Sequence, residues 1–227
     1  MAGLDRRLRL VRRLSQAKQR EKLGLFVAEG EDLLDAARAA AIEPVDVLVA
    51  GGDVSQEQLA AVSTLGHPPR VIAVFRRADL PSGEVPGDGT GLGLWRVRDP
   101  ANVGALIRTA DALGGSFVAL SDGCADPTGP KALRVSMGAL FRVPLLDLEQ
   151  APRPWTALVA HGGEPLAPPE RGTLVLGAER EGLPPELLAR CDARQTILLA
   201  DGAESLNVAA AGAIALYERV RRRSANQ

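Results

Sequence analysis

Residues 174–185 read LVLGAEREGLPP, a short apolar stretch that runs into a turn rich in glycine and proline. Residues 174–176 are typical of a buried strand, and Gly177 and Gly182 let the backbone pass close to a ligand. The same alternation continues on both sides of this stretch. We expect strands at 92–97, 116–120, 156–160, 173–177 and 196–199, and helices at 100–113, 130–140, 184–190 and 206–223. Repeated βα units with apolar strands indicate an α/β fold with a parallel sheet covered by helices on both faces.

The first 80 residues form a smaller alternating unit. We expect helices at 4–22, 32–41 and 55–65, and strands at 25–28, 45–50 and 71–75. Residues 81–91, which read PSGEVPGDGTG, are typical of a linker or a long loop. The sequence therefore predicts two domains, 1–86 and 87–227.

The composition excludes several classes of protein. With 227 residues, 46% of them hydrophobic, the chain can bury a core, but no apolar run reaches the ~20 residues of a membrane span. Cys124 and Cys191 form no CxxC or metal-ligand spacing, which argues against structural zinc and fits the reducing cytoplasm. Aromatic residues make up only 3%, which disfavours a base-stacking platform for RNA.

The net charge of −1 hides a basic N-terminus. Residues 1–22 hold eight Lys and Arg against Asp5 and Glu21, a local charge of +6, which leaves −7 for the rest of the chain. A basic end of this kind indicates a polyanionic partner. A helix with a merely solvated basic face is the alternative.

The glycines of the segment 87–93, GDGTGLG, resemble a nucleotide-binding loop, but their position is wrong for one. Such a loop follows a strand and opens a helix. Here the glycines follow a proline-rich turn and precede a strand, so a linker is the better interpretation.

Three further features each have a structural explanation when taken singly. Asp99 suits an N-cap and Pro100 the first turn of the helix that follows, while Arg108 lies off the apolar stripe of that helix and can face a cleft. The turn at 177–182 can be an ordinary connection. Ser205 suits the N-cap of a helix that begins at Leu206.

Taken together, the three features closely resemble the motifs of the SpoU/TrmH family of RNA ribose 2′-O-methyltransferases, within the SPOUT superfamily. The motifs match, in order, Asn102-x-Gly104-x-x-x-Arg108, Gly177-x-Glu179-x-x-Gly182 and Ser205-Leu206-Asn207-Val208. Residues 134–144, RVSMGALFRVP, are also similar to a family segment. The segment from Lys18 to Gly30 more weakly resembles the L30e-like RNA-binding domain that often precedes the catalytic domain.

The resemblance implies a trefoil-knotted catalytic domain, a homodimer, and S-adenosyl-L-methionine (AdoMet) as methyl donor without a metal. The AdoMet pocket would involve Leu176, Gly177, Ile197, Leu206 and Ala210. The arginine that matches Arg108 is proposed in similar enzymes to activate the ribose hydroxyl. The residues that would position the arginine, a phosphate or the ribose are Asn102, Glu179, Ser205 and Asn207. The residues that we expect to contact RNA are Arg12, Arg13, Lys18, Arg20 and Arg134.

The predicted function is thus AdoMet-dependent transfer of a methyl group to a ribose 2′-hydroxyl, with 23S rRNA favoured as the substrate. Two alternatives stay open: a tRNA 2′-O-methyltransferase, and a non-catalytic RNA-binding protein of the same fold. A Rossmann-type enzyme is disfavoured by the position of the glycine run.

Overall fold

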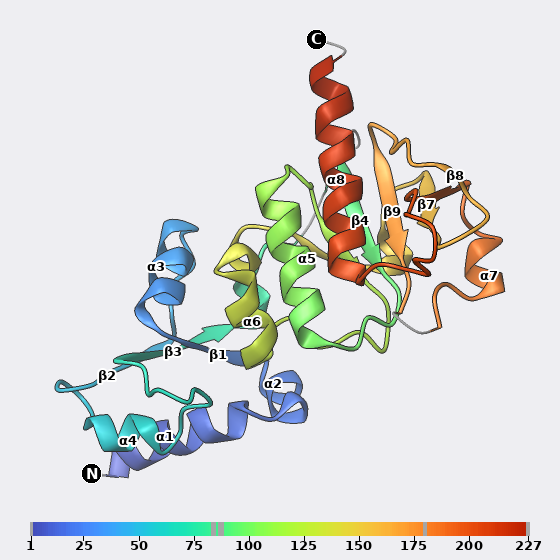
Figure 1. The fold of residues 1–227 in the computed structure, drawn as a ribbon. Helices are drawn as coiled ribbons and strands as arrows, with labels where there is room; N and C mark the ends of the chain where they lie inside the picture. Colours follow the sequence, from blue (N-terminus) through green and yellow to red (C-terminus); the bar gives the residue numbers. More distant parts are fainter. Residues whose placement is uncertain (1, 83–84, 86–88, 179–180, 226–227) are drawn as a thin grey trace. The chain divides into compact units, whose positions relative to one another are not determined.

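The computed structural model describes residues 2–82, 85, 89–178 and 181–225 (Figure 1). The chain forms two compact units. Unit 1 comprises residues 1–80 and 126–142, and unit 2 comprises 81–125 and 143–227. No helix among the described residues has the length and apolar character needed to cross a membrane.

Unit 1 is built on a three-stranded antiparallel sheet in the order β1-β3-β2, with Val27 of β1 opposite Val74 of β3. The strands are β1 (Leu25–Glu29), β2 (Asp46–Val49) and β3 (Val71–Arg76). The helices are α1 (Ala2–Leu14), α2 (Ala17–Leu23), α3 (Glu31–Ala39), α4 (Gln56–Ala60) and α6 (Pro130–Ser136), with short 3₁₀ turns at Arg77–Asp79 and Ala139–Phe141. The predicted alternation of helices and strands is confirmed for residues 1–80.

The single helix predicted at 4–22 is wrong, because the structure has two helices there. Gln16 has an extended backbone, with φ −91° and ψ 127°, which ends the helical path after Leu14. The guanidinium of Arg20 donates hydrogen bonds to the carbonyl oxygens of Leu14 and Ser15, each at 2.9 Å. Carbonyls at a helix end lack partners within the helix, so Arg20 supplies the missing ones and stabilises the break.

Residues 126–142 pack with the first unit rather than with the sheet of the second. Phe141 lies 6.1 Å from Phe26 and 5.3 Å from Phe75 between ring centroids, and all three rings are buried. Aromatic pairs at these distances are mutually stabilising. A domain boundary at 86/87 stays a prediction, but the compact units assign this later segment to unit 1.

Unit 2 contains a seven-stranded sheet in the order β6-β5-β4-β9-β7-β10-β8, and every pair of neighbouring strands is parallel. The strands are β4 (Thr90–Leu94), β5 (Val118–Leu120), β6 (Leu145–Asp147), β7 (Trp155–Leu158), β8 (Glu164–Pro165), β9 (Gly172–Leu176) and β10 (Ala193–Thr196). The helices are α5 (Pro100–Ala112), α7 (Pro185–Leu188) and α8 (Val208–Ala225), with a 3₁₀ turn at Leu148–Gln150. The predicted parallel α/β sheet is confirmed, while the knot and the L30e-like fold of unit 1 stay predictions.

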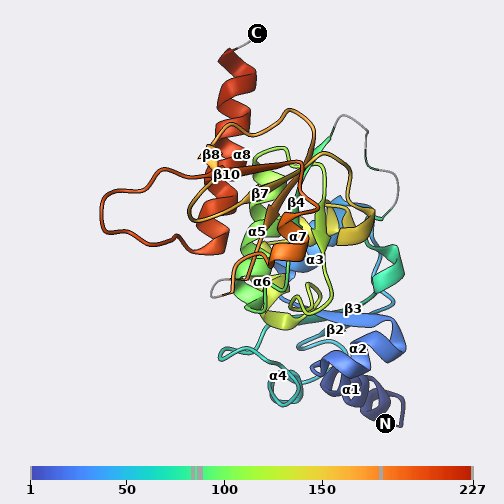
Figure 2. The same ribbon diagram turned by 90° about the vertical axis from the view of Figure 1, so that its right-hand side faces the viewer.

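The two faces of this sheet are covered by different elements. Helices α5 and α8 lie side by side on one face (Figures 1 and 2). On the other face, Val175 belongs to a cluster with Trp155 and with Leu187 of α7. Successive residues of a strand point to opposite faces, so the continuous apolar run of β9 supplies both layers of the core.

The glycine run marks the start of a strand, not a nucleotide-binding loop. Strand β4 begins at Thr90, and a Cβ atom at Gly91 would collide with Phe117, and one at Gly93 with Leu148 and Thr173. The glycines therefore permit close packing against neighbouring elements. Gly87 and Asp88, which belong to the same run, lie outside the described residues.

Candidate functional site

A cavity opens where three neighbouring strands of unit 2 end. Strands β7, β9 and β10 are parallel, so the segments that follow them meet at one edge of the sheet. The cavity is lined by Leu158, Val159, Ala160, Leu176, Gly177, Ala178, Gly182, Ile197, Leu199, Ser205, Leu206, Val208 and Ala211. Figure 2 shows residues 197–207 as an open loop between β10 and α8.

The turn after β9 forms one wall of the cavity and depends on glycine. A Cβ atom at Gly177 would collide with the backbone of Gly182. The turn is closed by a hydrogen bond that the Gly182 amide donates to the Ala178 carbonyl oxygen at 2.8 Å. Glu179, which we predicted to take part in the site, lies outside the described residues.

Two predicted residues that are 105 positions apart meet beside the cavity. The Asn207 side-chain amide donates a hydrogen bond from Nδ2 to Oδ1 of Asn102 at 3.2 Å. Asn102 is 8% exposed and lies in the first turn of α5, which Asp99 caps by accepting from the Ala101 amide at 2.9 Å. The first and third sequence motifs are therefore in contact.

The N-cap of α8 is Asn207, so the prediction of Ser205 was wrong. Helix α8 begins at Val208, and Oδ1 of Asn207 accepts hydrogen bonds from the amides of Ala209 at 2.9 Å and Ala210 at 3.3 Å. Asn and Ser cap helices about equally well, so residue type alone does not choose between them. The structure places Ser205 on the cavity wall instead.

Arg108 and Ala210 do not line the cavity. Arg108 is exposed on α5, six residues after Asn102, or about 9 Å along the helix axis. No hydrogen bond or ion pair joins its guanidinium to another residue of the part that the structure describes. Ala210 is exposed, and the neighbouring Val208 and Ala211 face the cavity in its place.

Helices α5 and α8 pack closely because α8 carries a small residue at the contact. A Cβ atom at Gly212 would collide with Leu106 of α5. Farther along, the guanidinium of Arg219, which is 8% exposed, donates a long hydrogen bond to the Gly114 carbonyl oxygen at 3.5 Å. Arg219 and Gly114 have the same sequence offset as Asn207 and Asn102, so the two helices run parallel and in register.

The cavity fits an adenosyl group. Its walls combine apolar side chains, such as Leu176, Ile197 and Leu206, with backbone groups of the turn at Gly177. A side chain at position 177 would disturb this cradle, as the collision with Gly182 indicates. Apolar walls with a few polar backbone groups are typical of sites for small organic ligands. Among the described residues, no group of three or more His, Cys, Asp or Glu could hold a metal ion.

Five residues of the predicted site line the cavity: Leu176, Gly177, Ile197, Ser205 and Leu206. Gly182, which belongs to the second sequence motif, lines it as well. The missed residues include Leu158, which ends β7, and Val159 and Ala160, which follow it. Strand β7 is not adjacent in sequence to the family motifs. The parallel pairing of β7 with β9 is the signal that places them here.

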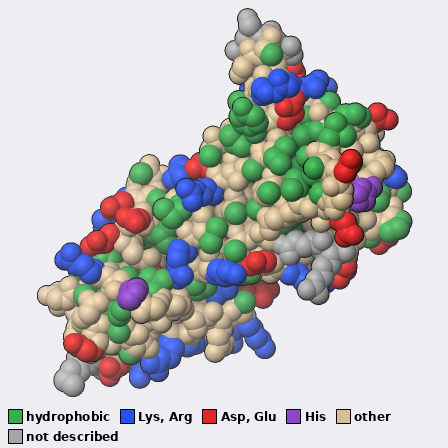
Figure 3. Space-filling model, viewed as in Figure 1, with side chains coloured by type: hydrophobic (Ala, Val, Ile, Leu, Met, Phe, Trp, Pro, Cys, Tyr) green, Lys and Arg blue, Asp and Glu red, His purple; other side chains and the backbone are tan. Residues whose placement is uncertain are grey.

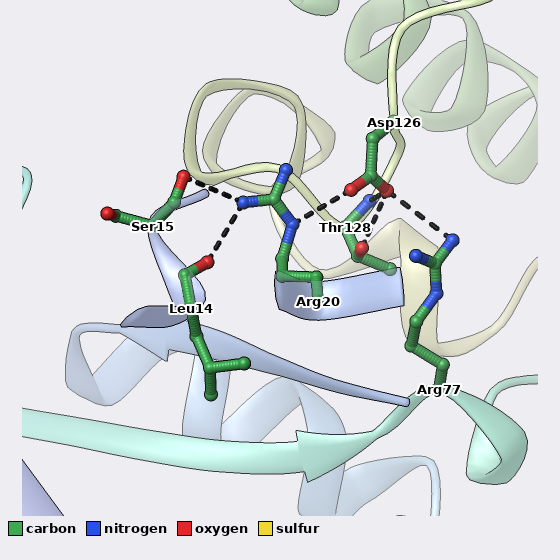
Figure 4. Close-up of polar contacts among 6 residues, drawn as sticks. All are labelled: Leu14, Ser15, Arg20, Arg77, Asp126 and Thr128. Atoms are coloured by element: carbon green, nitrogen blue, oxygen red, sulfur yellow. Dashed lines mark hydrogen bonds and ion pairs between the residues drawn. The ribbon is translucent and has the colours of Figure 1, made fainter. Parts of the chain in front are cut away.

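The predicted RNA-contacting residues divide into exposed and buried ones. Arg12, Arg13, Lys18 and Arg134 are exposed. Arg20 is 4% exposed, and its Nε atom donates to the Asp126 carboxylate at 2.8 Å (Figure 4). The prediction that Arg20 contacts RNA was wrong, because its guanidinium is enclosed by Asp126 and two backbone carbonyls.

Asp126 is the centre of this buried network. Its carboxylate accepts hydrogen bonds from the amide and hydroxyl of Thr128 and lies 3.6 Å from the guanidinium of Arg77 (Figure 4). Burial acts to raise the pKa of Asp126, but the hydrogen bond from Thr128 and the charges of Arg20 and Arg77 outweigh it and lower the pKa. The network keeps Asp126 ionised and therefore stabilises unit 1.

Comparison with known proteins adds independent findings. A family model described as the SpoU rRNA Methylase family matches residues 90–217. The 23S rRNA (guanosine(2553)-2′-O)-methyltransferase RlmP of Bacillus subtilis is 30% identical, over 91% of this chain and 92% of that protein. The family resemblance predicted from the motifs is confirmed.

Solved structures agree with the fold. An AdoMet-bound rRNA methyltransferase from Sinorhizobium meliloti superimposes with a TM-score of 0.82 at 27% identity, over 95% of this chain and 94% of that one. A structure described as giving insights into 2-OH methylation of C/U34 on tRNA has a TM-score of 0.51 at 30% identity. The latter match covers 99% of that chain but only 61% of this one.

Proposed function

The chain belongs to the SpoU rRNA methylase family, and we propose that it transfers a methyl group from AdoMet to a ribose 2′-hydroxyl of large-subunit ribosomal RNA. The observation that carries the proposal is the contact between Asn102 and Asn207 beside the cavity. Two motifs far apart in the sequence converge on a pocket that fits an adenosyl group. A protein that only binds RNA has no need for this arrangement.

The proposed donor site is the cavity, with Leu176, Gly177, Ile197 and Leu206 holding AdoMet. When bound, AdoMet supplies an electrophilic methyl group on a sulfonium and leaves as a neutral thioether. The protein must then accommodate the proton and the developing negative charge of the ribose 2′-oxygen. A guanidinium stays protonated, so Arg108 acts by stabilising that charge rather than by removing the proton. Asn102, Ser205 and Asn207 position the reacting groups, and we assign the same role to Glu179.

A homodimer would complete the site. Arg108 is exposed outside the cavity, so a second copy can bring the arginine of one protomer to the pocket of its partner. Ile214 and Tyr217 of α8 are 39% and 58% exposed, and hydrophobic side chains gather on the face of unit 2 that Figure 3 shows. Burial of such a surface against a second copy is favourable. Analytical sedimentation tests the homodimer: we expect wild type to sediment as a dimer and Tyr217→Glu as a monomer. A wild type that sediments as a monomer would contradict the homodimer.

We favour ribosomal RNA over tRNA as the substrate because the relative named for rRNA matches more of this chain than the structure connected with tRNA. The RlmP match spans both units, whereas the structure connected with tRNA covers about as much of this chain as unit 2 alone. The first unit is thus shared with an enzyme named for rRNA. The proposed place of action is the cytoplasm, where ribosomes are made.

The deciding experiment is transfer of a labelled methyl group from AdoMet to total RNA from cells that lack this protein, followed by nucleoside analysis. We expect a labelled 2′-O-methyl nucleoside in the large-subunit rRNA, and no transfer to RNA from cells that contain the protein. Label in the tRNA fraction would keep the chemistry and overturn the substrate. Absence of both AdoMet binding and transfer would support a non-catalytic RNA-binding protein.

A further inference from the structure

The outward side of α1 and α2 carries six exposed cations: Arg6, Arg9, Arg12, Arg13, Lys18 and Lys22. We call this set the basic face. Arg6, Arg9 and Arg13 are spaced by three and four residues, so they lie along one side of α1. Val11 and Leu14, on the opposite side, are only 3% and 1% exposed. Lys and Arg side chains gather along the lower edge of the molecule in Figure 3, where α1 lies.

The other two basic residues of this segment have a different role. Arg7 is paired with Asp46 at 2.6 Å, and Arg20 with Asp126 at 2.8 Å. No residue of the basic face lies within 4.0 Å of a carboxylate in the described ranges. Arg12 donates to the Ala61 carbonyl oxygen and Arg13 to the Gln19 side chain, and both partners are neutral. The chain therefore neutralises the inward cations and leaves the outward ones uncompensated.

Exposed arginines elsewhere show that pairing is available to this chain. Six of them lie within 4.0 Å of a carboxylate: Arg70, Arg76, Arg98, Arg153, Arg190 and Arg221. Like charges three and four residues apart destabilise a helix, so a row of unpaired arginines on α1 costs stability. A polyanion bound on this face would remove the repulsion.

The buried side of α1 decides which kind of polyanion fits. A helix that binds a membrane surface inserts an apolar face between the lipids. In α1 that face is already used, because Val11 and Leu14 pack in a core with Val27, Leu48 and Ile72 of the sheet. Only charge is available for binding, which suits the phosphate backbone of a nucleic acid.

We propose that the basic face binds the phosphate backbone of the RNA substrate and holds it by charge, without reading its sequence. The inference rests on the proposed function for the identity of the RNA. Compared with the RNA-contacting residues predicted from the sequence, the basic face lacks the buried Arg20 and gains Arg6, Arg9 and Lys22. Arg134, which lies on α6, stays a separate prediction. Each phosphate contact releases counterions, so binding through this face is strongly dependent on salt.

The test compares wild type with the triple variant Arg6→Gln, Arg9→Gln and Arg13→Gln, in the full chain. The probe is large-subunit rRNA from cells that lack the protein, and its affinity is measured at several salt concentrations. Three lost phosphate contacts lower the slope of log affinity against log salt by about 2 to 3, and lower the affinity about 100-fold at 0.1 M salt. In methyl transfer we expect a higher KM for RNA and an unchanged kcat.

The matched control is Arg171→Gln, Arg194→Gln and Arg222→Gln, which removes the same charge from exposed positions of unit 2. We expect the control to keep the salt slope and affinity of wild type. The control variant should melt at the wild-type temperature, because none of its replaced side chains is buried or ion-paired among the described residues. The basic-face variant should melt at that temperature or slightly above it, because it also loses the repulsion between like charges on α1.

Three outcomes would overturn the inference. The first is an unchanged rRNA affinity and salt slope in the basic-face variant, and the second is an equal loss in both triple variants. The third is a basic-face variant that binds rRNA like wild type but no longer binds phosphatidylglycerol vesicles that wild type binds. Failure of the proposed function looks different. Wild type would then transfer no methyl group to any RNA, while rRNA binding and its loss in the basic-face variant would still decide the inference.

Discussion

The two compact units use polar side chains for opposite purposes. In unit 1 the buried polar contact is an ion pair, Arg20 with Asp126, and its role is to hold the chain together. In unit 2 the corresponding contact is a neutral amide pair, Asn207 with Asn102, next to a cavity. A charged residue in a sequence can thus be either buried structure or exposed binding surface, whereas Gly177 and Gly182 after an apolar run indicate a tight turn directly.

The largest effect should come from Arg108, which has no hydrogen bond or ion pair with any residue that the structure describes. Replacing Arg108 with Ala removes the proposed stabiliser of charge on the ribose oxygen. Loss of one such group typically costs a factor of about 10² to 10³ in rate, so we expect methyl transfer to fall by at least 100-fold. AdoMet affinity should stay within a few-fold of wild type, since Arg108 does not line the cavity.

Single-turnover transfer to rRNA and calorimetric AdoMet binding measure the two quantities separately. Arg194→Ala, at another exposed arginine of unit 2, is the control and should retain full activity. Wild-type turnover by Arg108→Ala would refute the role of this arginine and would remove the reason to bring a second copy to the cavity.

Unit 2 was the more predictable unit because its signals are local. The apolar run of β9 and the glycines at 177 and 182 predicted a buried strand and a tight turn, and both are present. Asp99 and Pro100 predicted the start of α5. Strand β10 was misplaced by about three residues, because Ile197 and Leu199 line the cavity instead of forming the strand.

Unit 1 was less predictable because its decisive contacts are remote. Arg20 reads as one more cation of a basic segment, and its partner Asp126 lies 106 positions away. The same contact explains the unpredicted break between α1 and α2, since Arg20 supplies partners for the carbonyls of Leu14 and Ser15. The charge pattern alone does not separate such a residue from the exposed Arg9 or Arg13.

The second prediction tests the structural role of the ion pair. Asp126→Ala leaves the guanidinium of Arg20, 4% exposed, without its counter-charge. Removing one partner of a buried pair costs about 3 kcal/mol. Both tryptophans, Trp95 and Trp155, belong to unit 2, so amide hydrogen exchange in β1 and β3 reports on unit 1 while tryptophan fluorescence reports on unit 2. We expect faster exchange in unit 1.

The control for this change is Arg77→Ala, the more exposed partner of Asp126 at 3.6 Å, which should cost less than about 1 kcal/mol.

The stabilisation by Asp126 depends on pH with a definite sign. Because the pKa of Asp126 is lowered in the folded state, its stabilisation is present above the unfolded pKa of about 3.9 and is lost as the pH falls through the folded value. The difference between wild type and Asp126→Ala should therefore shrink below about pH 4. A difference that grows with acid would contradict the ion-pair account.

The third prediction concerns the cavity wall. Gly177→Ala places a Cβ atom against the backbone of Gly182 and displaces the turn. Overpacking of this kind costs about 1–3 kcal/mol, so AdoMet affinity measured by calorimetry should fall about tenfold or more. Gly66→Ala, where a Cβ atom meets nothing within 4 Å, is the control and should bind AdoMet normally. Normal binding by Gly177→Ala would place the donor site elsewhere.

The smallest effect separates the two functions of Asn207. Asn207→Ala removes both the cap of α8 and the hydrogen bond to Asn102, and loss of a cap costs about 1 kcal/mol. Asn207→Asp keeps an oxygen for the cap but replaces the Nδ2 donor with an acceptor that faces Oδ1 of Asn102. Urea unfolding followed by tryptophan fluorescence should therefore show a larger loss of stability for Asn207→Ala, which loses the cap as well, than for Asn207→Asp, while methyl transfer should fall in both variants. Full activity in Asn207→Asp would mean that Asn207 is a cap alone, and the amide pair of unit 2 would then be as purely structural as the ion pair of unit 1.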